Sequence, residues 1–230
     1  MDLKNPFTFF LLLITVNIIA YGLTIAISKL WNKIYNYQEV LLKREIIDSI
    51  LILCINIIIA IPGYTLWLKD VIIFSESSIW LSFVGVFLLM DFLMYILHYL
   101  SHSIGLLNKI HSKHHEHSDK FNCVSLYHMS PWESIFFGLL LTMVTILFQF
   151  NIYGFILFLF FNWLYGLITH LNGNNYKPFL FIFTTNTFHK AHHRLNNRNF
   201  GFYTFFWDKL FKTEEKDEIR LLTKHKNNKG

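Results

Sequence analysis

The stretch IWLSFVGVFLLMDFLMYILHYLSH, residues 79–102, is an almost continuous apolar run that ends in two histidines. A helix of about 20 apolar residues crosses the hydrocarbon core of a bilayer, so this stretch is long enough to span a membrane. The helical period places Asp91 on the same stripe as His98 and His102. Because ionisable groups are costly inside a membrane and are usually functional there, the stripe indicates a helix that leads to a chemical site.

The composition is that of a membrane protein. Apolar residues make up 53% of the 230 residues and charged residues only 15%, with 25 phenylalanines. The net charge is +5, but the basic residues flank apolar stretches and are not interleaved with aromatic residues, which argues against a nucleic-acid partner. The two cysteines, Cys54 and Cys123, form no C-x-x-C pair. This excludes a disulfide framework and a thiolate zinc site.

Four further apolar stretches predict membrane helices. They are Pro6–Ile27, Ile46–Leu68, Ser134–Phe150 and Ile152–Thr169. We therefore expect an all-α integral membrane bundle of about four to five spans. The first stretch lacks the strong basic n-region and the cleavage site of a signal peptide, so we expect it to be a retained span.

The lysines and arginines predict the orientation of these spans. Eighteen of them lie in the loop after the first span, in the loop after residues 79–102 and in the C-terminal segment, whereas only Lys4 and Lys69 lie on the opposite side. The positive-inside rule places the basic segments in the cytoplasm. Every clustered histidine then belongs to a cytosolic, histidine-rich helical cap. The membrane is expected to be the plasma or inner membrane in a bacterium and the endoplasmic reticulum in a eukaryote.

Eight of the twelve histidines fall into three tight sets. These are H-x-x-x-H at His98 and His102, H-x-x-H-H at His111, His114 and His115, and the same spacing at His189, His192 and His193. On a helix, spacings of three and four place imidazoles on one face. Gathering so many donors would be costly unless a cation compensated for their desolvation and ordering. One tetrahedral zinc takes four ligands, so the count predicts two ions, and imidazole suits Fe, Zn, Cu and Ni alike.

Three residues outside the sets are candidate participants. His170 ends the fifth apolar stretch, on the same face of the membrane as the first histidine set, which indicates a ligand. His128 lies just before the fourth stretch and is a tentative ligand. Asp91 is a tentative outer-shell carboxylate, which would orient a ligand imidazole from another segment through its second nitrogen.

Other polar residues near the sets have simpler explanations. Glu133 suits the first turn of a helix that begins at Pro131. We expect Glu116 and His117 to be exposed. His225 lies in the charged C-terminal tail and is assigned no role.

Two other protein classes remain open from these residues alone. A zinc-dependent membrane hydrolase would need fewer ligands and an open coordination position. A metal transporter or metal-handling protein would need ligands along a path through the spans. The gathering of the histidines on one face favours a reaction site beside the bilayer.

The order of the three sets resembles the fatty acid hydroxylase / sterol desaturase superfamily of membrane di-iron oxygenases. The sequence context agrees, with D-x-x-x-Y-x-x-H at residues 91–98, N-x-x-H-x-x-H-H at residues 186–193 and the ending NFGFYTFFWDKLFKT at residues 199–213. The similarity runs from about Trp80 to Thr213. Three ordered histidine motifs together with this ending are specific at the level of the superfamily.

The apolar stretches, the resemblance and the composition of the tail together predict three regions. Residues 1–78 are N-terminal membrane spans, residues 79–213 are a di-metal catalytic domain, and residues 214–230 are a charged, disordered tail. The implied metal ligands are His98, His102, His111, His114, His115, His189, His192 and His193, with His170 as a further family histidine. Asn186, which precedes the last set, is a tentative outer-shell residue.

The resemblance also implies an activity. Members of the superfamily are O2-dependent oxidoreductases that hydroxylate or desaturate a C–H bond of a lipid, such as a fatty acyl chain or a sterol. The implied cofactors are two iron ions, with zinc possible in the isolated protein, and O2. The sequence has no dinucleotide-binding fingerprint, so electrons are expected from an external donor, either a separate protein or a reduced pterin.

Overall fold

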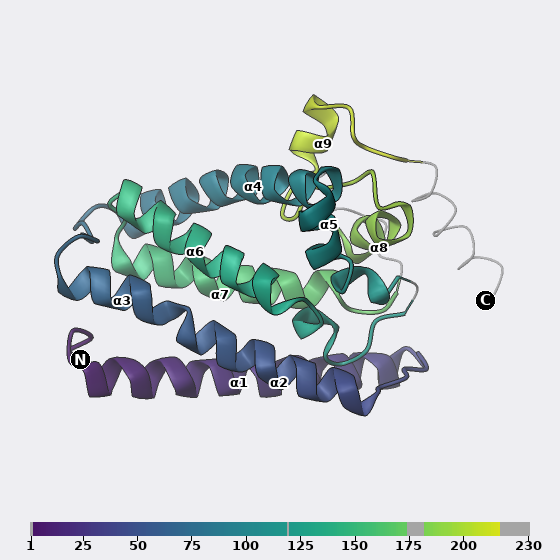
Figure 1. Cartoon of the computed structure of the whole chain (residues 1–230), viewed down its shortest axis with the longest axis horizontal. Coiled ribbons are helices and arrows are strands. Elements are labelled where there is room, and N and C mark those ends of the chain that lie inside the picture. The colour runs from purple at the N-terminus through teal and green to yellow at the C-terminus, as the bar shows by residue number, and fades with distance from the viewer. Residues whose placement is uncertain (1, 119, 174–181, 217–230) are drawn as a thin grey trace.

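Nine α-helices and two 3-10 turns make up the computed structural model, which describes residues 2–118, 120–173 and 182–216. The α-helices are α1 (Pro6–Ile34), α2 (Lys43–Ile58), α3 (Ala60–Leu68), α4 (Ile79–Ser103), α5 (Gly105–His111), α6 (Pro131–Leu147), α7 (Ile152–Thr169), α8 (Asn186–Leu195) and α9 (Phe206–Leu210). The 3-10 turns are η1 (His114–Glu116) and η2 (Ser125–Tyr127). The long helices run side by side, and the short helices α5, α8 and α9 gather at one end of them (Figure 1).

In the part of the chain that the structure describes, four helical segments are long and apolar enough to cross a membrane. They are α1, the nearly continuous pair α2–α3, α4 and α7. Helix α6, at 17 residues, is a shorter apolar helix. The expected all-α membrane bundle is therefore confirmed. Helix α1 continues to Ile34, beyond the apolar stretch that predicted it, because its last two turns place Ser28 and Asn32 against the protein.

Helix α1 turns its polar residues inward and its apolar residues outward. Thr24, Ser28 and Asn32, spaced by four, are buried, whereas most of the apolar side chains of the helix are exposed. Trp163 Nε1 on α7 donates to Thr24 Oγ1 at 3.1 Å, and Asn172 Nδ2 donates to Asn32 Oδ1 at 3.1 Å. Such a pattern suits a helix surrounded by lipid, where polar groups must find partners within the protein.

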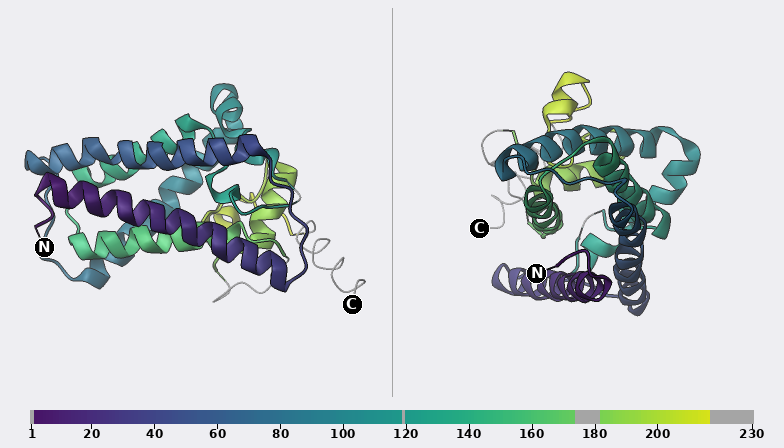
Figure 2. Two further views of the ribbon diagram at one scale, coloured as in Figure 1. Left: turned by 90° about the horizontal axis from the view of Figure 1, so that it is seen from below. Right: turned by 90° about the vertical axis from the view of Figure 1, so that its left-hand side faces the viewer.

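Helices α4 and α7 pack closely against each other and form the core of the bundle (Figure 2). The core includes Val86 and Met90 on α4, Phe158 and Tyr165 on α7, and Tyr203 from the C-terminal segment. All five residues are at most 9% exposed. The C-terminal segment is thus packed directly onto this helix pair.

A glycine on α7 permits the close approach of these two helices. A Cβ at Gly154 would lie 2.5 Å from Ile79 O and 2.8 Å from Ser82 Cβ on α4. We expect Gly154→Ala to lower the free energy of unfolding by about 1–3 kcal/mol, because α4 must shift to make room. Gly22→Ala on α1 is the matched control, since its Cβ would meet nothing within 4 Å. Thermal unfolding in detergent measures both, and equal destabilisation of the two variants would contradict the prediction.

Asp91 ties the C-terminal segment to α4. It accepts hydrogen bonds from Thr204 N at 3.0 Å, Thr204 Oγ1 at 2.6 Å and Trp207 Nε1 at 3.0 Å. These three donors satisfy a carboxylate that is only 3% exposed. The buried Asp91 therefore fixes the segment that follows α8 on the surface of the bundle.

Candidate metal centre

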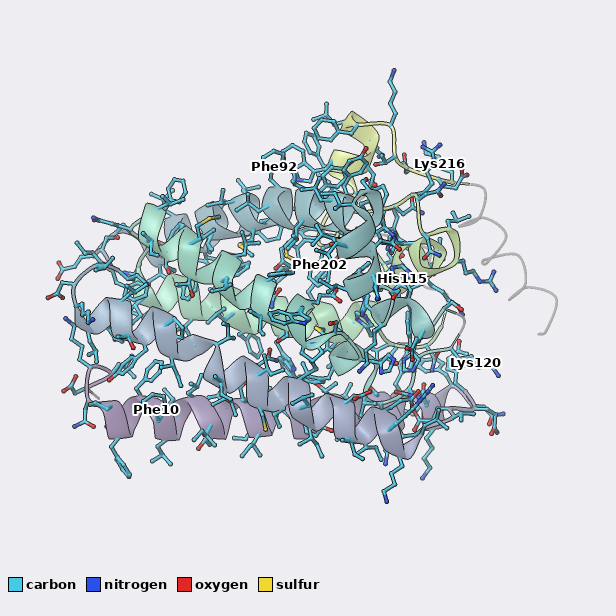
Figure 3. All side chains as sticks on the ribbon, in the orientation of Figure 1. Phe10, Phe92, His115, Lys120, Phe202 and Lys216 are labelled. Carbon is cyan, nitrogen blue, oxygen red and sulfur yellow. The ribbon has the colours of Figure 1, made fainter. Side chains whose placement is uncertain are left out.

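Nine histidines form two groups at the end of the bundle where α5 and α8 lie (Figure 3, near the label of His115). The five-histidine group consists of His98, His102, His111, His115 and His192, and the four-histidine group of His114, His170, His189 and His193. Within each group, one ring nitrogen of every member lies within 4.8 Å of those of the others. The structure thus brings together all eight histidines of the three sequence sets, and His170 joins them.

The first H-x-x-H-H set is divided between the two groups. Its chain is only partly α-helical, because α5 ends at His111 and the 3-10 turn η1 begins at His114. His111 and His115 turn toward the five-histidine group, and His114 turns toward the four-histidine group. This short segment therefore contributes to both groups.

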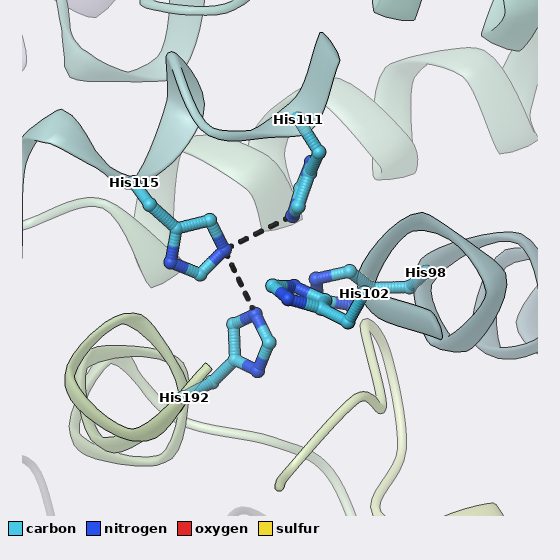
Figure 4. Close-up of side chains that lie close together, drawn as sticks. All are labelled: His98, His102, His111, His115 and His192. Carbon is cyan, nitrogen blue, oxygen red and sulfur yellow. Dashed lines mark hydrogen bonds between the residues drawn. The ribbon is translucent and has the colours of Figure 1, made fainter. Parts of the chain in front are cut away.

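The second H-x-x-H-H set, on α8, is also divided, but two of its members join the four-histidine group and one joins the five-histidine group. His189 and His193, four residues apart on one face of the helix, belong to the four-histidine group. His192 belongs to the five-histidine group and faces the rings of His98 and His102 (Figure 4). The two groups are adjacent, because the rings of His115 and His193 stack with their centroids 4.4 Å apart.

Each group has an aromatic side chain against it. The ring of Phe200 lies 5.6–5.8 Å from three rings of the five-histidine group, those of His98, His102 and His192. Phe121 is 2% exposed and lies 5.3 Å from the ring of His170 in the four-histidine group. These apolar covers exclude water, which strengthens electrostatic interactions inside the site.

Access from the surface differs between the groups. A small pocket of about 90 Å³ reaches the five-histidine group and is lined by His102, His115, Asn108, Ser112 and Asn196. All members of the four-histidine group are buried, with exposures between 2% and 8%. In the described part of the chain, the five-histidine group is thus the more accessible of the two.

Main-chain oxygens fix the ring orientation of five of these histidines. The Nδ1–O pairs are His98 with Phe200 (2.8 Å), His192 with Arg198 (2.7 Å), His170 with Gly166 (2.7 Å), His114 with His128 (3.2 Å) and His115 with His193 (3.4 Å). A carbonyl oxygen only accepts, so each Nδ1 carries the proton. The lone pair of each neutral ring is then on Nε2, which is the atom that faces the centre of its group.

The donor arrangement fits metal ions. His115 Nε2 lies 3.0 Å from His111 Nε2 and 3.2 Å from His192 Nε2 (dashed lines in Figure 4), so unprotonated nitrogens face each other. Two imidazoles bound to one ion at about 2.1 Å have nitrogens roughly 3.0–3.4 Å apart. Within the described residues, His98 Nε2 and both ring nitrogens of His102 are buried without a hydrogen-bonding partner. A bound cation would satisfy these buried, unpaired nitrogens.

Burial keeps several of the clustered histidines neutral. It lowers the pKa of His115 to about 3 and that of His170 to about 4. Burial and the neighbouring imidazoles also hold the pKa of His114, His189 and His192 well below the ordinary value. Neutral imidazole is the form that binds metal, so the cap is in its binding state at neutral pH.

The depressed pKa values predict an acid-labile cap. Between the folded pKa values and the ordinary value of 6.5, the unfolded chain binds protons that the folded cap excludes. Stability is therefore full above pH 6.5 and falls as the pH drops, by up to about 1.4 kcal/mol per histidine for each pH unit. Thermal unfolding of the metal-free chain from about pH 7 to 5 measures this loss. A metal-loaded sample is the control, and a flat profile of the metal-free chain would contradict the prediction.

Comparison with known protein families accounts for this arrangement. The profile of the fatty acid hydroxylase family matches residues 83–213, which is more than half of the chain and includes both histidine groups. The chain belongs to the fatty acid hydroxylase family. The superfamily resemblance of the three histidine motifs is thereby confirmed. Comparisons with curated proteins and with solved structures gave no match.

Two tentative outer-shell residues of this family member have other contacts than expected. The carboxylate of Asp91 accepts from Thr204 and Trp207, and among the described residues it contacts no ligand imidazole. Asp91 lies almost two helical turns from His98 on α4, and the C-terminal segment covers it first. Asn186 Nδ2 donates to Leu171 O at 3.1 Å, which joins the start of α8 to the end of α7.

His128, the tentative ligand, lies outside both groups. Its side chain stacks on His117 with ring centroids 4.3 Å apart, and its Nε2 lies 3.2 Å from Glu116 Oε2. Only its main-chain oxygen faces the site, where it accepts from His114. His117 was expected to be exposed, but its side chain is only 11% exposed and binds Glu45. Glu116 is exposed, as expected, and His225 lies outside the described residues.

The segment at residues 199–213, which resembles the ending of the family sequences, is held together by hydrogen bonds beside the site. Asp208 accepts from Phe200 N at 2.8 Å, Gly201 N at 2.7 Å and Thr213 Oγ1 at 2.7 Å. Phe200 O in turn accepts from Nδ1 of His98. A Cβ at Gly201 would clash with Thr204 O and Asp208, so only glycine fits there. The W-D pair thus holds the loop that orients one of the candidate ligands.

Two contacts beside the histidine groups were not found from the sequence. Glu133 Oε1 lies 2.8 Å from His111 Nδ1, although its position in the first turn of α6 had been explained by helix formation alone. Glu45 on α2 lies 3.0 Å from His117 Nε2, two residues beyond His115. Both contacts join segments far apart in the chain. The sequence shows only that Glu45 and Glu133 each lie in the first turn of an apolar helix.

Proposed function

We propose that this protein is an O2-dependent di-iron oxidoreductase that hydroxylates or desaturates a C–H bond of a membrane lipid, such as a fatty acyl chain or a sterol. The observation that carries the proposal is the pair of adjacent histidine groups at the end of an apolar helical bundle. The five-histidine group would hold one iron ion and the four-histidine group the other. Such ions supply O2 activation and C–H oxidation.

The reaction requires an external source of electrons. Hydroxylation converts one C–H bond, O2, two electrons and two protons into an alcohol and one water. Desaturation consumes two C–H bonds on adjacent carbons with O2, two electrons and two protons, and gives an alkene and two waters. A separate electron-donor protein or a reduced pterin would supply the electrons. The residues of the chain bind the ions, exclude water through Phe121 and Phe200, and admit small molecules through the pocket beside His102.

The lipid substrate would reach the site from the bilayer. The apolar side chains of α1 and of the α2–α3 pair are largely exposed, as they are in helices surrounded by acyl chains. The excess of lysine and arginine at the histidine-bearing end supports a cytoplasmic location for the site. In a bacterium the host membrane would be the plasma or inner membrane, and in a eukaryote the endoplasmic reticulum.

The arrangement argues against the two rival classes. A single zinc ion of a hydrolase would be satisfied by the four-histidine group and would leave five clustered histidines without a role. A metal transporter would need ligands distributed across the bundle, whereas these histidines gather at one end of it. Zinc in the purified protein remains compatible with the proposal, since imidazole also binds zinc well.

Metal analysis combined with comparative lipidomics tests the proposal. The purified protein is expected to contain two metal ions per chain. Cells that express the chain are expected to contain a lipid that has gained one oxygen atom or lost two hydrogen atoms. Cells that express His192→Ala serve as the control and should lack that lipid. One zinc per chain with hydrolysed lipids, or metal flux into vesicles without O2 consumption, would contradict the proposal.

A further inference from the structure

One histidine of the five-histidine group has a carboxylate as its partner. His111 Nδ1 lies 2.8 Å from Glu133 Oε1, and the His111 side chain is only 6% exposed. His111 is the last residue of α5, and Glu133 is in the first turn of α6, which packs against α5. The other ring nitrogen of His111, Nε2, faces His115 Nε2 at 3.0 Å. Glu133 therefore contacts the far side of a candidate ligand.

This partner is chemically different from those of the neighbouring histidines. Five other members of the two groups donate Nδ1–H to a neutral main-chain oxygen, as His98 does to Phe200. In the described part of the chain, the carboxylate partner within the two groups is found at His111 alone. A hydrogen bond to a carboxylate is roughly twice as strong as one between neutral groups. It also makes the imidazole a better metal donor through its second nitrogen.

We propose that Glu133 is a positioning residue that strengthens His111 as a metal ligand and thereby raises the metal affinity of the five-histidine group. The inference rests on the proposed function, because it requires that the two groups bind metal ions. Glu133 Oε2 is buried and has no hydrogen-bonding partner among the described residues, so the contact with His111 is the main polar contact of this carboxylate. A role in helix formation alone would not require that contact.

Two substitutions separate charge from orientation. Glu133→Gln keeps an oxygen that accepts from His111 Nδ1 but removes the negative charge, and Glu133→Ala removes both. We expect Glu133→Gln to weaken the binding of one of two Co²⁺ ions by about 10- to 100-fold, as loss of an outer-shell partner does in other metal sites. Glu133→Ala should weaken it at least as much. Competition with a chelator gives the two affinities, and the Co²⁺ absorption spectrum reports the changed ligand environment.

Glu116→Gln is the matched control. Glu116 also contacts a histidine, His128, at 3.2 Å, but His128 belongs to neither group. This variant should bind both Co²⁺ ions with the affinities of the unmodified protein. Thermal unfolding of the metal-free variants checks that Glu133→Gln has kept the fold.

Each outcome decides the inference. Selective weakening of one ion in folded Glu133→Gln supports it. Unchanged affinities for both ions, or equal weakening of both together with a lower melting temperature, would overturn the inference while leaving the proposed function intact. An unmodified chain that binds no Co²⁺, Zn²⁺ or Fe²⁺ tightly would overturn the proposed function, and the inference with it.

Discussion

His192→Ala and His114→Ala are each expected to abolish lipid oxidation and to remove one metal ion, but not the same ion. His192 belongs to the five-histidine group and His114 to the four-histidine group, so each substitution deletes a donor from one group only. Loss of an outer-shell partner typically costs 10- to 100-fold in affinity or activity, so loss of a direct ligand should lower the rate by more than about 100-fold. The remaining ion should stay bound in each variant, although less tightly, because the two groups share the segments that carry their donors.

Metal content per chain and product formation in membranes measure these effects. His128→Asn is a suitable control, because His128 is equally buried but lies outside both groups. It should retain two ions and most of the activity. If His192→Ala and His114→Ala both kept two ions and full lipid oxidation, the di-metal assignment would be wrong.

Glu45→Ala is expected to produce the largest loss of stability, about 3–5 kcal/mol. The carboxylate is 5% exposed and accepts from His117 Nε2 at 3.0 Å, Asn122 Nδ2 at 2.9 Å and Leu42 N at 2.8 Å. Removing it leaves three donors unpaired beside the segment that carries His115. Thermal unfolding and metal content should therefore fall together, although Glu45 lies outside the region that defines the family.

Asp48→Asn is the matched control on the same helix. Asp48 pairs with Lys113 at 2.8 Å, but both side chains are more than a quarter exposed. Such a pair contributes about 0–1 kcal/mol, so the variant should unfold almost as the unmodified protein does. If Glu45→Ala were no more harmful than Asp48→Asn, α2 would not be an anchor of the histidine segment.

The fold and the members of the site followed from patterns within short stretches. Hydropathy over residues 79–102 and the other apolar stretches predicted the long helices, because a membrane helix is defined by its own length and composition. Spacing alone identified the three histidine sets, since neighbouring turns of a helix share a face. His170 was found because a span end and a histidine coincide there.

Contacts between distant segments were not predictable in the same way. The alternate assignment of His114 and His192 depends on how η1 meets α8, which no local pattern specifies. The partner of Asp91 was missed because Thr204 lies 113 residues away. The partner of Glu133 was missed because its position in the first turn of α6 already had a sufficient local explanation. Each of these contacts is decided by packing and not by spacing.

The division of each H-x-x-H-H set between the two groups has a consequence for metal uptake. The segment of His111, His114 and His115 and helix α8 each supply donors to both groups. An ion that enters one group therefore holds both segments together and so orders the donors of the other group before a second ion arrives. The conformational entropy of these two segments is therefore lost mainly when the first ion binds. Each ion would thus stabilise the fold of the whole histidine cap as well as its own group.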